Sequence, residues 1–275
     1  MLSDVMHDDM RVAYLIIAHN EFEVLQHLVA ALDDVWCDIY IHFDAKVDRL
    51  PEIRVEKSSL HILEKRVRVR WGTASQIEAE YALWKTAANN GCYSHYVLLS
   101  GTHYPLVSRE EIQSYLSSRE GLALVPKMER ACDYQVDLKM ILYDFLPCTA
   151  FWKVALKFQR VFHIGRNRRS EFYNGGNWVV LPQEAVDWLL AHRRVILRKY
   201  RWTFCGDEFF VPTELMSSPF CGRVLFSSDL LKFDIGRSNA RVYNLEDLDE
   251  LKASGCMFAR KLTLESMPLI KELKR

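Results

Sequence analysis

The chain of 275 residues is long enough for one large domain or two small ones, and its 49% hydrophobic content supplies a sizeable core. Its 36 Lys and Arg residues balance its 36 Asp and Glu residues, which excludes a global attraction to nucleic acid or to an anionic membrane. Any anion site must therefore be local. The sequence has no run of about 18 apolar residues, so we expect no membrane-spanning helix.

The cysteines and the first residues together predict a location in the cytoplasm. The first ten residues have neither the basic nor the apolar stretch of a signal peptide. The seven cysteines are odd in number and contain no Cys-x-x-Cys pair, which favours reduced thiols over disulfides or zinc ligands. Pairing of some of these thiols stays open if the chain is exported.

The N-terminal part reads as a β-α-β unit. Residues 12–18 form a continuous apolar run, typical of a strand buried on both faces. Residues 21–32 carry a helical apolar stripe, and residues 39–43 form a second short strand. This order predicts a parallel sheet, in which ligands bind at the carboxyl ends of the strands. His19 and Asp44 both follow such ends.

The next segments continue the α/β pattern. A helix is expected from Trp71-Gly72-Thr73 to about Asn90, and a buried strand over residues 95–99. That strand runs into a segment that begins Ser100-Gly101-Thr102-His103 and continues to Leu106. Residues 128–167 mix aromatic and basic side chains and give no clear pattern.

The last third contains the stretch on which the functional argument depends. A strand is expected over residues 176–181, then a helix to about Tyr200, and a further helix from Gly206 to about Leu215. A short amphipathic helix is expected over residues 245–253. No repeat, low-complexity tract or Pro/Gly/Ser linker interrupts the chain, so we predict a single α/β domain over residues 1–275.

Glu208 is the first candidate for chemistry, because it falls at the expected start of a helix. The common interpretation of such a residue is that it merely complements the helix dipole. The same backbone N–H groups also keep a carboxylate ionised. An ionised carboxylate in a cleft is what a general base needs.

Basic residues near the C-terminal end are candidates for binding a diphosphate. Arg241, Arg260 and Lys261 are usually expected to be solvated, but converging cations could stabilise a departing diphosphate. The only Asp-x-Asp motif, Asp247-Leu248-Asp249, lies in an amphipathic helical pattern where positions i and i+2 diverge. We interpret it as a solvated face, so no metal site is expected.

Several other classes of enzyme lack their sequence signatures. The sequence has no Gly-x-Gly-x-x-Gly fingerprint, no phosphate-binding P-loop and no Gly-x-Ser-x-Gly elbow. Its nine histidines include no His-x-x-x-His pair on a helix. A different α/β nucleotide enzyme is therefore disfavoured, and no cofactor is expected.

Taken in order, the motifs resemble the core-2/I-branching N-acetylglucosaminyltransferase and peptide xylosyltransferase family (glycosyltransferase family 14), in its short bacterial form. The matching motifs span almost the whole chain: residues 13–20, 41–46, 69–72 with Ser75, 99–101 with 104–106, 175–178, 207–208 and 258–261. Each motif alone is weak, whereas the ordered set is specific.

The resemblance implies a GT-A-like domain with a mostly parallel central sheet flanked by helices. It also implies a UDP-sugar donor, inversion at the anomeric carbon and no metal requirement. Residues from about 10 to 125 would form the nucleotide-binding half, and those from about 126 to 275 the acceptor and catalytic half. The implied nucleotide pocket comprises Ile17, Ala18, His19, Asp44 and Trp71.

The resemblance also assigns the catalytic roles. Glu208 matches the catalytic base, and Arg241 and Lys261 match the basic pair that takes the place of the metal at the diphosphate. Candidates for binding the donor sugar or the acceptor are Ser100, Gly101, His103, Trp178 and Asp207.

One departure leaves the sugar open. Family members commonly have an aspartate where this chain has His103, so the donor sugar (N-acetylglucosamine or xylose-like) and the acceptor (a carbohydrate or a glycolipid) are not settled. The implied role is bacterial surface polysaccharide synthesis, in the cytoplasm or peripherally at the inner membrane face. The alternative is a carbohydrate- or nucleotide-binding protein that keeps the fold without turnover, against which the intact Asp207-Glu208 pair argues.

Overall fold

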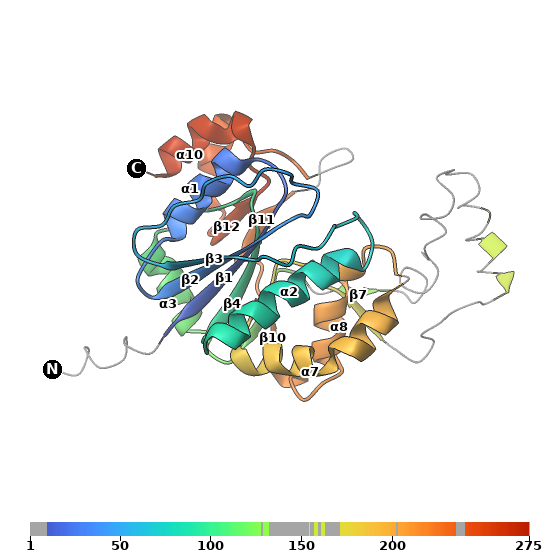
Figure 1. The fold of residues 1–275 in the computed structure, drawn as a ribbon. Helices are drawn as coiled ribbons and strands as arrows, with labels where there is room; N and C mark the ends of the chain where they lie inside the picture. The colour runs from blue at the N-terminus through green and yellow to red at the C-terminus, as the bar shows by residue number, and fades with distance from the viewer. Residues whose placement is uncertain are drawn as a thin grey trace.

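The computed structural model describes residues 10–127, 129–131, 154, 157–158, 161–162, 171–201, 203–234 and 240–274. Its main feature is a seven-stranded sheet in the order β10-β6-β9-β4-β1-β2-β3 (Figure 1). The strands are β1 (Val12–Ala18), β2 (Cys37–Phe43), β3 (Ser59–Ile62), β4 (His95–Ser100), β6 (Ala123–Val125), β9 (Val180–Leu181) and β10 (Val224–Phe226). Only β9 runs antiparallel to its neighbours, β4 and β6. The prediction of an α/β fold with a mostly parallel sheet is confirmed.

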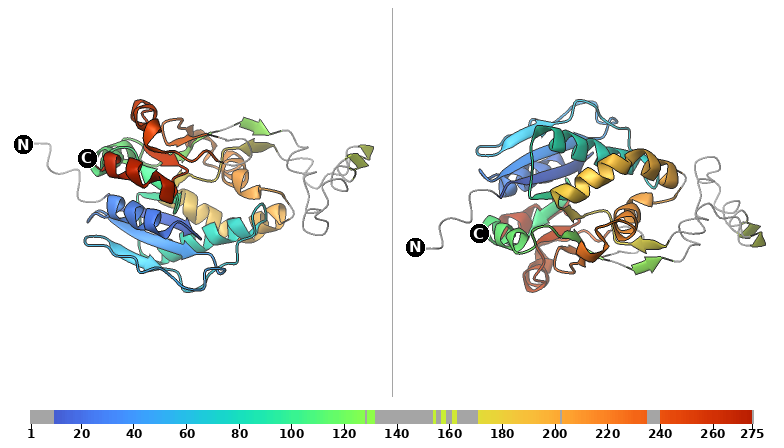
Figure 2. Two further views of the ribbon diagram at one scale, coloured as in Figure 1. Left: turned by 90° about the horizontal axis from the view of Figure 1, so that it is seen from above. Right: turned by 90° about the horizontal axis from the view of Figure 1, so that it is seen from below.

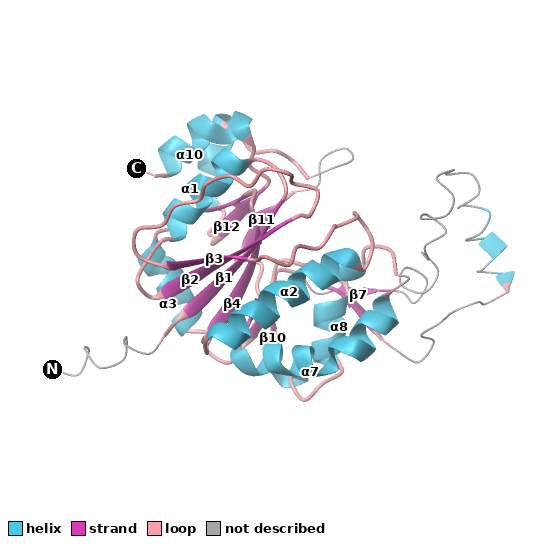
Figure 3. Ribbon diagram, in the orientation of Figure 1, coloured by secondary structure: helices cyan, strands magenta, loops and turns pink. Residues whose placement is uncertain are grey.

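Helices cover both faces of this sheet (Figure 3). Those on the two faces are α1 (Phe22–Leu32), α3 (Arg109–Ser117), α2 (Ser75–Asn90) and α7 (Gln183–Tyr200), with α8 (Phe210–Met216) beside α7. The C-terminal helices α9 (Leu248–Ala253) and α10 (Met267–Leu273) pack in a separate core with residues of α1, β5 and β12. Because side chains alternate along a strand, Tyr14 and Ile16 of β1 join the core under α1 and α3. Leu15 and Ile17 join the opposite core, under α2 and α7. The apolar run of β1 is thus buried on both faces, as predicted.

A second, three-stranded sheet carries the C-terminal part of the site. It has the order β11-β12-β5, with β5 (His103–Pro105), β11 (Leu231–Phe233) and β12 (Phe258–Arg260). β5 runs antiparallel to β12, and Arg260 pairs with His103 in the register. The C-terminal elements lie beside α1 (Figure 2), where the N–H of Leu264 donates to Glu21 Oε2 at 2.8 Å.

Short elements complete the described chain. β7 (Glu129–Ala131) pairs with β8 (Phe172–Asn174), and the 3₁₀ helices are η1 (Gly206–Glu208), η2 (Cys221–Arg223), η3 (Leu245–Asp247) and η4 (Leu264–Ser266).

Two predicted elements differ from the structure. The strand expected over residues 176–181 is reduced to Val180 and Leu181, because only these residues pair with β4 and β6. The single helix expected from Gly206 divides into η1 and α8, with Phe209 between them. Most of the unassigned segment 128–167 lies outside the described residues. Among the described helices, none combines the length and the apolar character needed to cross a membrane.

Candidate active site

Most of the predicted nucleotide-pocket residues lie together at the carboxyl ends of the central strands. The N–H of Gly101, after β4, donates to the carbonyl oxygen of Ile17 at 2.9 Å. The N–H of Asp44, after β2, donates to the carbonyl oxygen of Ala18 at 2.9 Å. Asp44 is buried, and its carboxylate lies 3.2 Å from the ammonium group of Lys46. The three strand ends therefore form one edge, where ligands bind in sheets of this type.

His19 follows β1 and lies among cations. Partial burial lowers the pKa of its ring, Asp44 raises it, and the charges of Lys46, Lys261 and Arg260 lower it further. This edge therefore has a positive local charge, although the formal net charge of the whole chain is zero. Such an edge suits an anionic group.

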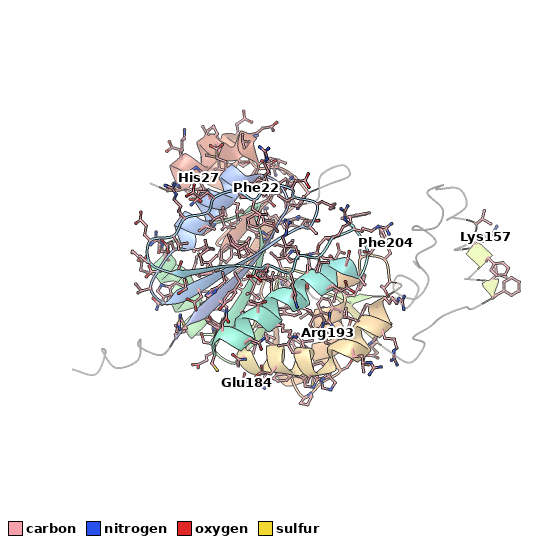
Figure 4. All side chains as sticks on the ribbon, viewed as in Figure 1. Phe22, His27, Lys157, Glu184, Arg193 and Phe204 are labelled. Carbon is pink, nitrogen blue, oxygen red and sulfur yellow. The ribbon has the colours of Figure 1, made fainter. Side chains whose placement is uncertain are left out.

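Trp71 lies on a loop that is fixed to the segment before Glu208. Its side chain is 73% exposed and packs edge-on against Phe204, with ring centroids 5.2 Å apart. Gly72 has a φ of +74°, and a Cβ there would lie 2.7 Å from the Phe204 ring, so this position requires glycine. The N–H of Cys205 donates to the carbonyl oxygen of Gly72 at 2.9 Å. Figure 4 labels Phe204 near the N-terminal end of α2.

Glu208 is the last residue of η1 and does not lie in the first turn of an α-helix. A single 3₁₀ turn aligns few peptide dipoles, so the expected stabilisation of an ionised Glu208 by a helix dipole is absent here. Backbone contacts hold the residue in place. Its N–H donates to the carbonyl oxygen of Cys205 at 3.1 Å, and its own carbonyl oxygen accepts the N–H of Gly175 at 3.0 Å. A Cβ on Gly175 would lie 2.8 Å from the carbonyl oxygen of Lys127, so glycine permits this close approach.

Three acidic side chains gather at η1. Burial, and then the charge of Glu208, raises the pKa of Asp207 to about 7. Asn177 donates to Asp207 Oδ2 at 3.3 Å, whereas Oδ1 is buried without a hydrogen-bond partner. Glu80 on α2 is fully buried, and burial followed by the charge of Asp207 raises its pKa well above the usual range. Carboxyl groups with raised pKa values are typical of sites that move protons.

Glu80 was missed in the sequence, although a signal for it exists. It lies three residues after Ile77 and four residues before Trp84, and both of these are fully buried. These spacings place Glu80 on the apolar stripe of α2. A carboxyl group in phase with a buried stripe is uncommon enough to mark a site worth examining.

The segment after β4 forms a buried polar cluster around His103. The N–H of Ser100 donates to His103 Nδ1 at 2.9 Å, and Ser100 Oγ lies 2.8 Å from the same nitrogen. An Nδ1 that accepts a hydrogen bond leaves the ring proton on Nε2, which is buried without a partner. Burial, and then the charge of Arg260, lowers the pKa of His103 well below its usual value, so the ring is neutral.

Trp178 lies against this cluster. The His103 ring packs edge-on against the Trp178 ring at a centroid distance of 4.9 Å, and the Arg260 guanidinium lies 5.1 Å from the Trp178 centroid. Arg260 Nε also donates to Ser100 Oγ at 3.3 Å. His103 and Trp178 line a cavity of about 10 Å³ with apolar residues of β4, β9, β11 and β12, which has room for about one water molecule. The structure thus brings the predicted Ser100, His103 and Trp178 together.

Residues 12–243 match the family model described as "Branch: Core-2/I-Branching enzyme". The chain belongs to the core-2/I-branching enzyme family. This family consists of glycosyltransferases, so the match also gives the class of the protein. Among solved structures, the apo form of mouse xyloside xylosyltransferase 1 aligns over 90% of this chain and 97% of that chain, with 10% sequence identity and a TM-score of 0.38. A search of curated proteins found no match.

In this core-2/I-branching chain, the two predicted diphosphate cations are neighbours through their backbones. The N–H of Lys261 donates to the carbonyl oxygen of Arg241 at 3.2 Å, and the N–H of Tyr243 donates to the carbonyl oxygen of Lys261 at 3.0 Å. Lys261 makes no ion pair with any acidic residue that the structure describes. Arg241 differs in this respect.

Arg241 is bound by three carboxylates. Its Nη1 lies 3.5 Å from Asp234 and 3.3 Å from Glu250, and its Nη2 contacts Asp247. The interpretation of Asp247 as part of a solvated face is wrong. Asp247 is buried and accepts the N–H of Asn244 at 2.8 Å in a capping box, because it is the last residue of η3 and contacts Arg241.

Proposed function

We propose that the protein transfers a sugar from a UDP-sugar to a hydroxyl group of a carbohydrate or glycolipid acceptor, with inversion and without a metal ion. The donor sugar is N-acetylglucosamine or a xylose-like sugar. The transfer would serve bacterial surface polysaccharide synthesis, in the cytoplasm or peripherally at the inner membrane face. One observation carries the proposal: the acidic residues of η1 and the cation Arg260 meet at one segment, because Asn177 donates to Asp207 Oδ2 at 3.3 Å and the next residue, Trp178, has its ring 5.1 Å from the Arg260 guanidinium.

In the proposed reaction Glu208 is the general base. Its carboxylate takes the proton of the acceptor hydroxyl while that oxygen forms a bond to the anomeric carbon. On the opposite side of this carbon the bond to the diphosphate oxygen breaks, and UDP leaves with the bonding electrons. The backbone contacts of Glu208 with Cys205 and Gly175 hold the base in position for this transfer.

The donor would lie along the edge formed by β1, β2 and β4. We propose that Ile17, Ala18, Asp44 and Trp71 line the nucleotide pocket. His19, Arg241 and Lys261 would face the diphosphate and stabilise the charge that develops as UDP leaves. A neutral His19 could donate a hydrogen bond there without adding charge.

The variant Glu208→Gln tests the base directly. A positioned base contributes about 10²- to 10⁴-fold to rate, so kcat should fall by that factor while UDP affinity stays within about twofold. UDP release from a panel of UDP-sugars with candidate acceptors measures the rate. The matched control is Glu184→Gln, which changes an exposed side chain of α7. Near-normal turnover in Glu208→Gln would remove it from this role. Activity that is lost in EDTA and restored by a divalent ion would overturn metal independence.

A second candidate is a binding protein that retains the fold without turnover. The buried, neutral His103 favours it, because the resembling family commonly has an acid at that position. This candidate predicts that UDP-sugars bind and raise the melting temperature, while no acceptor in the panel releases UDP.

A further inference from the structure

Glu80 is a carboxyl group enclosed in the core where α2 meets η1. It is fully buried, and so are its neighbours on the same stripe of α2, Ile77 and Trp84. The helix packs against η1, and a Cβ on Gly206 of η1 would lie 3.4 Å from the Ile77 side chain. The buried stripe of α2 therefore places Glu80 against the segment that carries the proposed base.

This carboxyl group must keep its proton. Its Oε1 accepts the side-chain N–H of Gln76 at 3.4 Å, and its Oε2 has no hydrogen-bond partner among the described residues. An ionised carboxylate in such surroundings is very costly, whereas a protonated carboxyl group is far less so. Protonation also turns Oε2 into an O–H donor, and a buried donor requires an acceptor.

Asp207 supplies the matching acceptor on η1. Its Oδ2 accepts from Asn177, whereas its Oδ1 is buried without a partner in the described part of the chain. After burial itself, the charge of Asp207 is what raises the pKa of Glu80. Trp84 Nε1 is also buried without a described partner, but it is a donor and cannot accept the Glu80 proton. The unpaired donor and the unpaired acceptor thus belong to two elements that pack on each other.

The other ionisable groups that face this core have different partners. Besides η1, α2 packs against β1, β2 and α7, and β1 contributes apolar side chains to this core. The partners are Tyr93 for Tyr40, the N–H of Val67 for His42, Glu214 for both Lys199 and Tyr200, the carbonyl oxygen of Leu189 for Tyr81, and the Tyr81 ring for Arg193. Within the described residues, Asp207 is left as the titratable group that acts on Glu80.

We propose that Glu80 is a positioning residue, whose protonated carboxyl group donates to Oδ1 of Asp207 and thereby fixes η1 and an ionised Asp207 beside Glu208. The inference rests on the proposed role of Glu208 as the base. One water molecule between the two oxygens would transmit the same hydrogen bond. A donor favours the charged form of its acceptor, and the negative charge of Asp207 then makes proton uptake by Glu208 more favourable. Glu80 acts on the base without touching the substrate.

Two variants separate the donor from the shape of the side chain. Glu80→Gln keeps a donor for Asp207 but has no proton to lose, and Glu80→Leu keeps a similar volume without a donor. Infrared spectra between pH 5 and pH 9, with and without ¹³C-labelled aspartate, follow the C=O stretch of protonated glutamate and aspartate side chains. The matched control is Glu78→Gln, which changes an exposed glutamate on the same helix.

The spectra of the wild type and of Glu78→Gln should contain a protonated glutamate band that persists at pH 8, and Glu80→Gln should lack it. The Asp207 band should disappear at about pH 7 in the wild type and in Glu80→Gln. In Glu80→Leu it should disappear about one to two pH units higher, the effect of one hydrogen bond to a charged group. A glutamate band that Glu80→Gln retains, or equal Asp207 midpoints in Glu80→Gln and Glu80→Leu, would overturn the proposal.

A third variant reaches the same contact from the other side and covers a folding defect in Glu80→Leu. Asp207→Asn replaces a charged acceptor by a neutral one, so the protonated Glu80 band should shift in frequency at pH 8. An unchanged Glu80 band in this variant would show that the two side chains do not interact.

The effect on turnover is measured separately, by UDP release from the panel of UDP-sugars and acceptors. At pH 7, kcat should fall about tenfold in Glu80→Leu and stay within about threefold in Glu80→Gln. The pH of half-maximal kcat should rise in Glu80→Leu alone. Tyr81→Phe removes a hydrogen bond from the same core and should lower stability without moving this pH.

A lower kcat in Glu80→Leu with an unshifted pH profile would mean that Glu80 is merely structural, and the positioning role would be wrong. Failure of the proposed function gives a different result. If the wild type releases UDP with none of the panel, the proposed transfer is wrong, and the infrared bands still decide whether Glu80 holds its proton against Asp207.

Discussion

Two acidic clusters in this protein differ in whether cations neutralise them. Around Arg241, the carboxylates of Asp234, Asp247 and Glu250 are all paired. Lys232 adds contacts to Asp234 at 3.2 Å and to Glu250 at 3.0 Å. This cluster is a closed network that ties η3 and α9 to the segment after β11.

At η1 the situation is reversed. Glu80 and Asp207 each have a buried oxygen without a hydrogen-bond partner, and burial raises the pKa of both. No described cation lies at bonding distance from either carboxyl group. The difference suggests that the Arg241 network serves mainly stability, whereas η1 retains carboxyl groups whose protons can move.

The largest effect on stability is expected at Asp207. The folded state holds the Asp207 proton up to about pH 7, whereas the unfolded chain releases it near pH 4. The folded state therefore binds more protons across that window, and the free energy of unfolding falls as pH rises through it. Asp207→Asn should remove this loss and raise the free energy of unfolding by about 2–4 kcal/mol at pH 8, since one pKa unit corresponds to about 1.4 kcal/mol.

Denaturant unfolding at pH 5 and pH 8 measures this effect. The difference in stability between the variant and the wild type should be large at pH 8 and small at pH 5. The exposed Asp249→Asn on α9 is the control and should show no such dependence. A constant difference at the two pH values would mean that Asp207 ionises normally in the folded protein.

The next effect contrasts the two diphosphate candidates. Lys261→Gln should weaken UDP about tenfold to a hundredfold, because Lys261 has no described acidic partner and would give its charge to the ligand. Arg241→Gln should weaken UDP less than tenfold, because three carboxylates already offset its charge. Calorimetric titration of UDP measures both, with the exposed Lys252→Gln as control. The opposite order would show that Arg241 leaves its network when UDP binds.

Local sequence patterns predicted the scaffold well. The apolar run of β1, the helical stripe of α1 and the β-α-β order determine a parallel sheet, and a parallel sheet brings His19, Asp44 and Ser100 to one edge. These inferences succeed because they depend on residues that are close in sequence.

The electrostatic state of the site could not be predicted in the same way. Whether Arg241 is neutralised depends on Asp234, which lies seven residues earlier, and on the fold of η3. Whether Arg260 faces a carboxylate across the strand pair depends on its register with His103 in β5, which is more than 150 residues away in the sequence. The amphipathic pattern around Asp247 was misleading, because a capping position and a facing arginine decide its burial.

The smallest expected effect separates the cap of η3 from the network that surrounds it. Asp247→Ala removes the acceptor for the N–H of Asn244 and also the contact with Arg241. Asn244→Ala removes only the other half of the capping box, in which the Asn244 side chain accepts the N–H of Glu246 at 2.8 Å. Loss of a cap costs about 0.5–2 kcal/mol of the free energy of unfolding, so Asn244→Ala should fall in that range.

The difference between these two variants then reports the Arg241–Asp247 contact. If the Arg241 network is structural, Asp247→Ala should be the less stable variant in denaturant unfolding, and both should bind UDP as the wild type does. Tighter UDP binding in Asp247→Ala alone would contradict this view, because it would mean that Asp247 holds Arg241 back from the diphosphate. The acidic cluster around Arg241 would then control how strongly the donor site binds UDP, and both acidic clusters would act on the substrate.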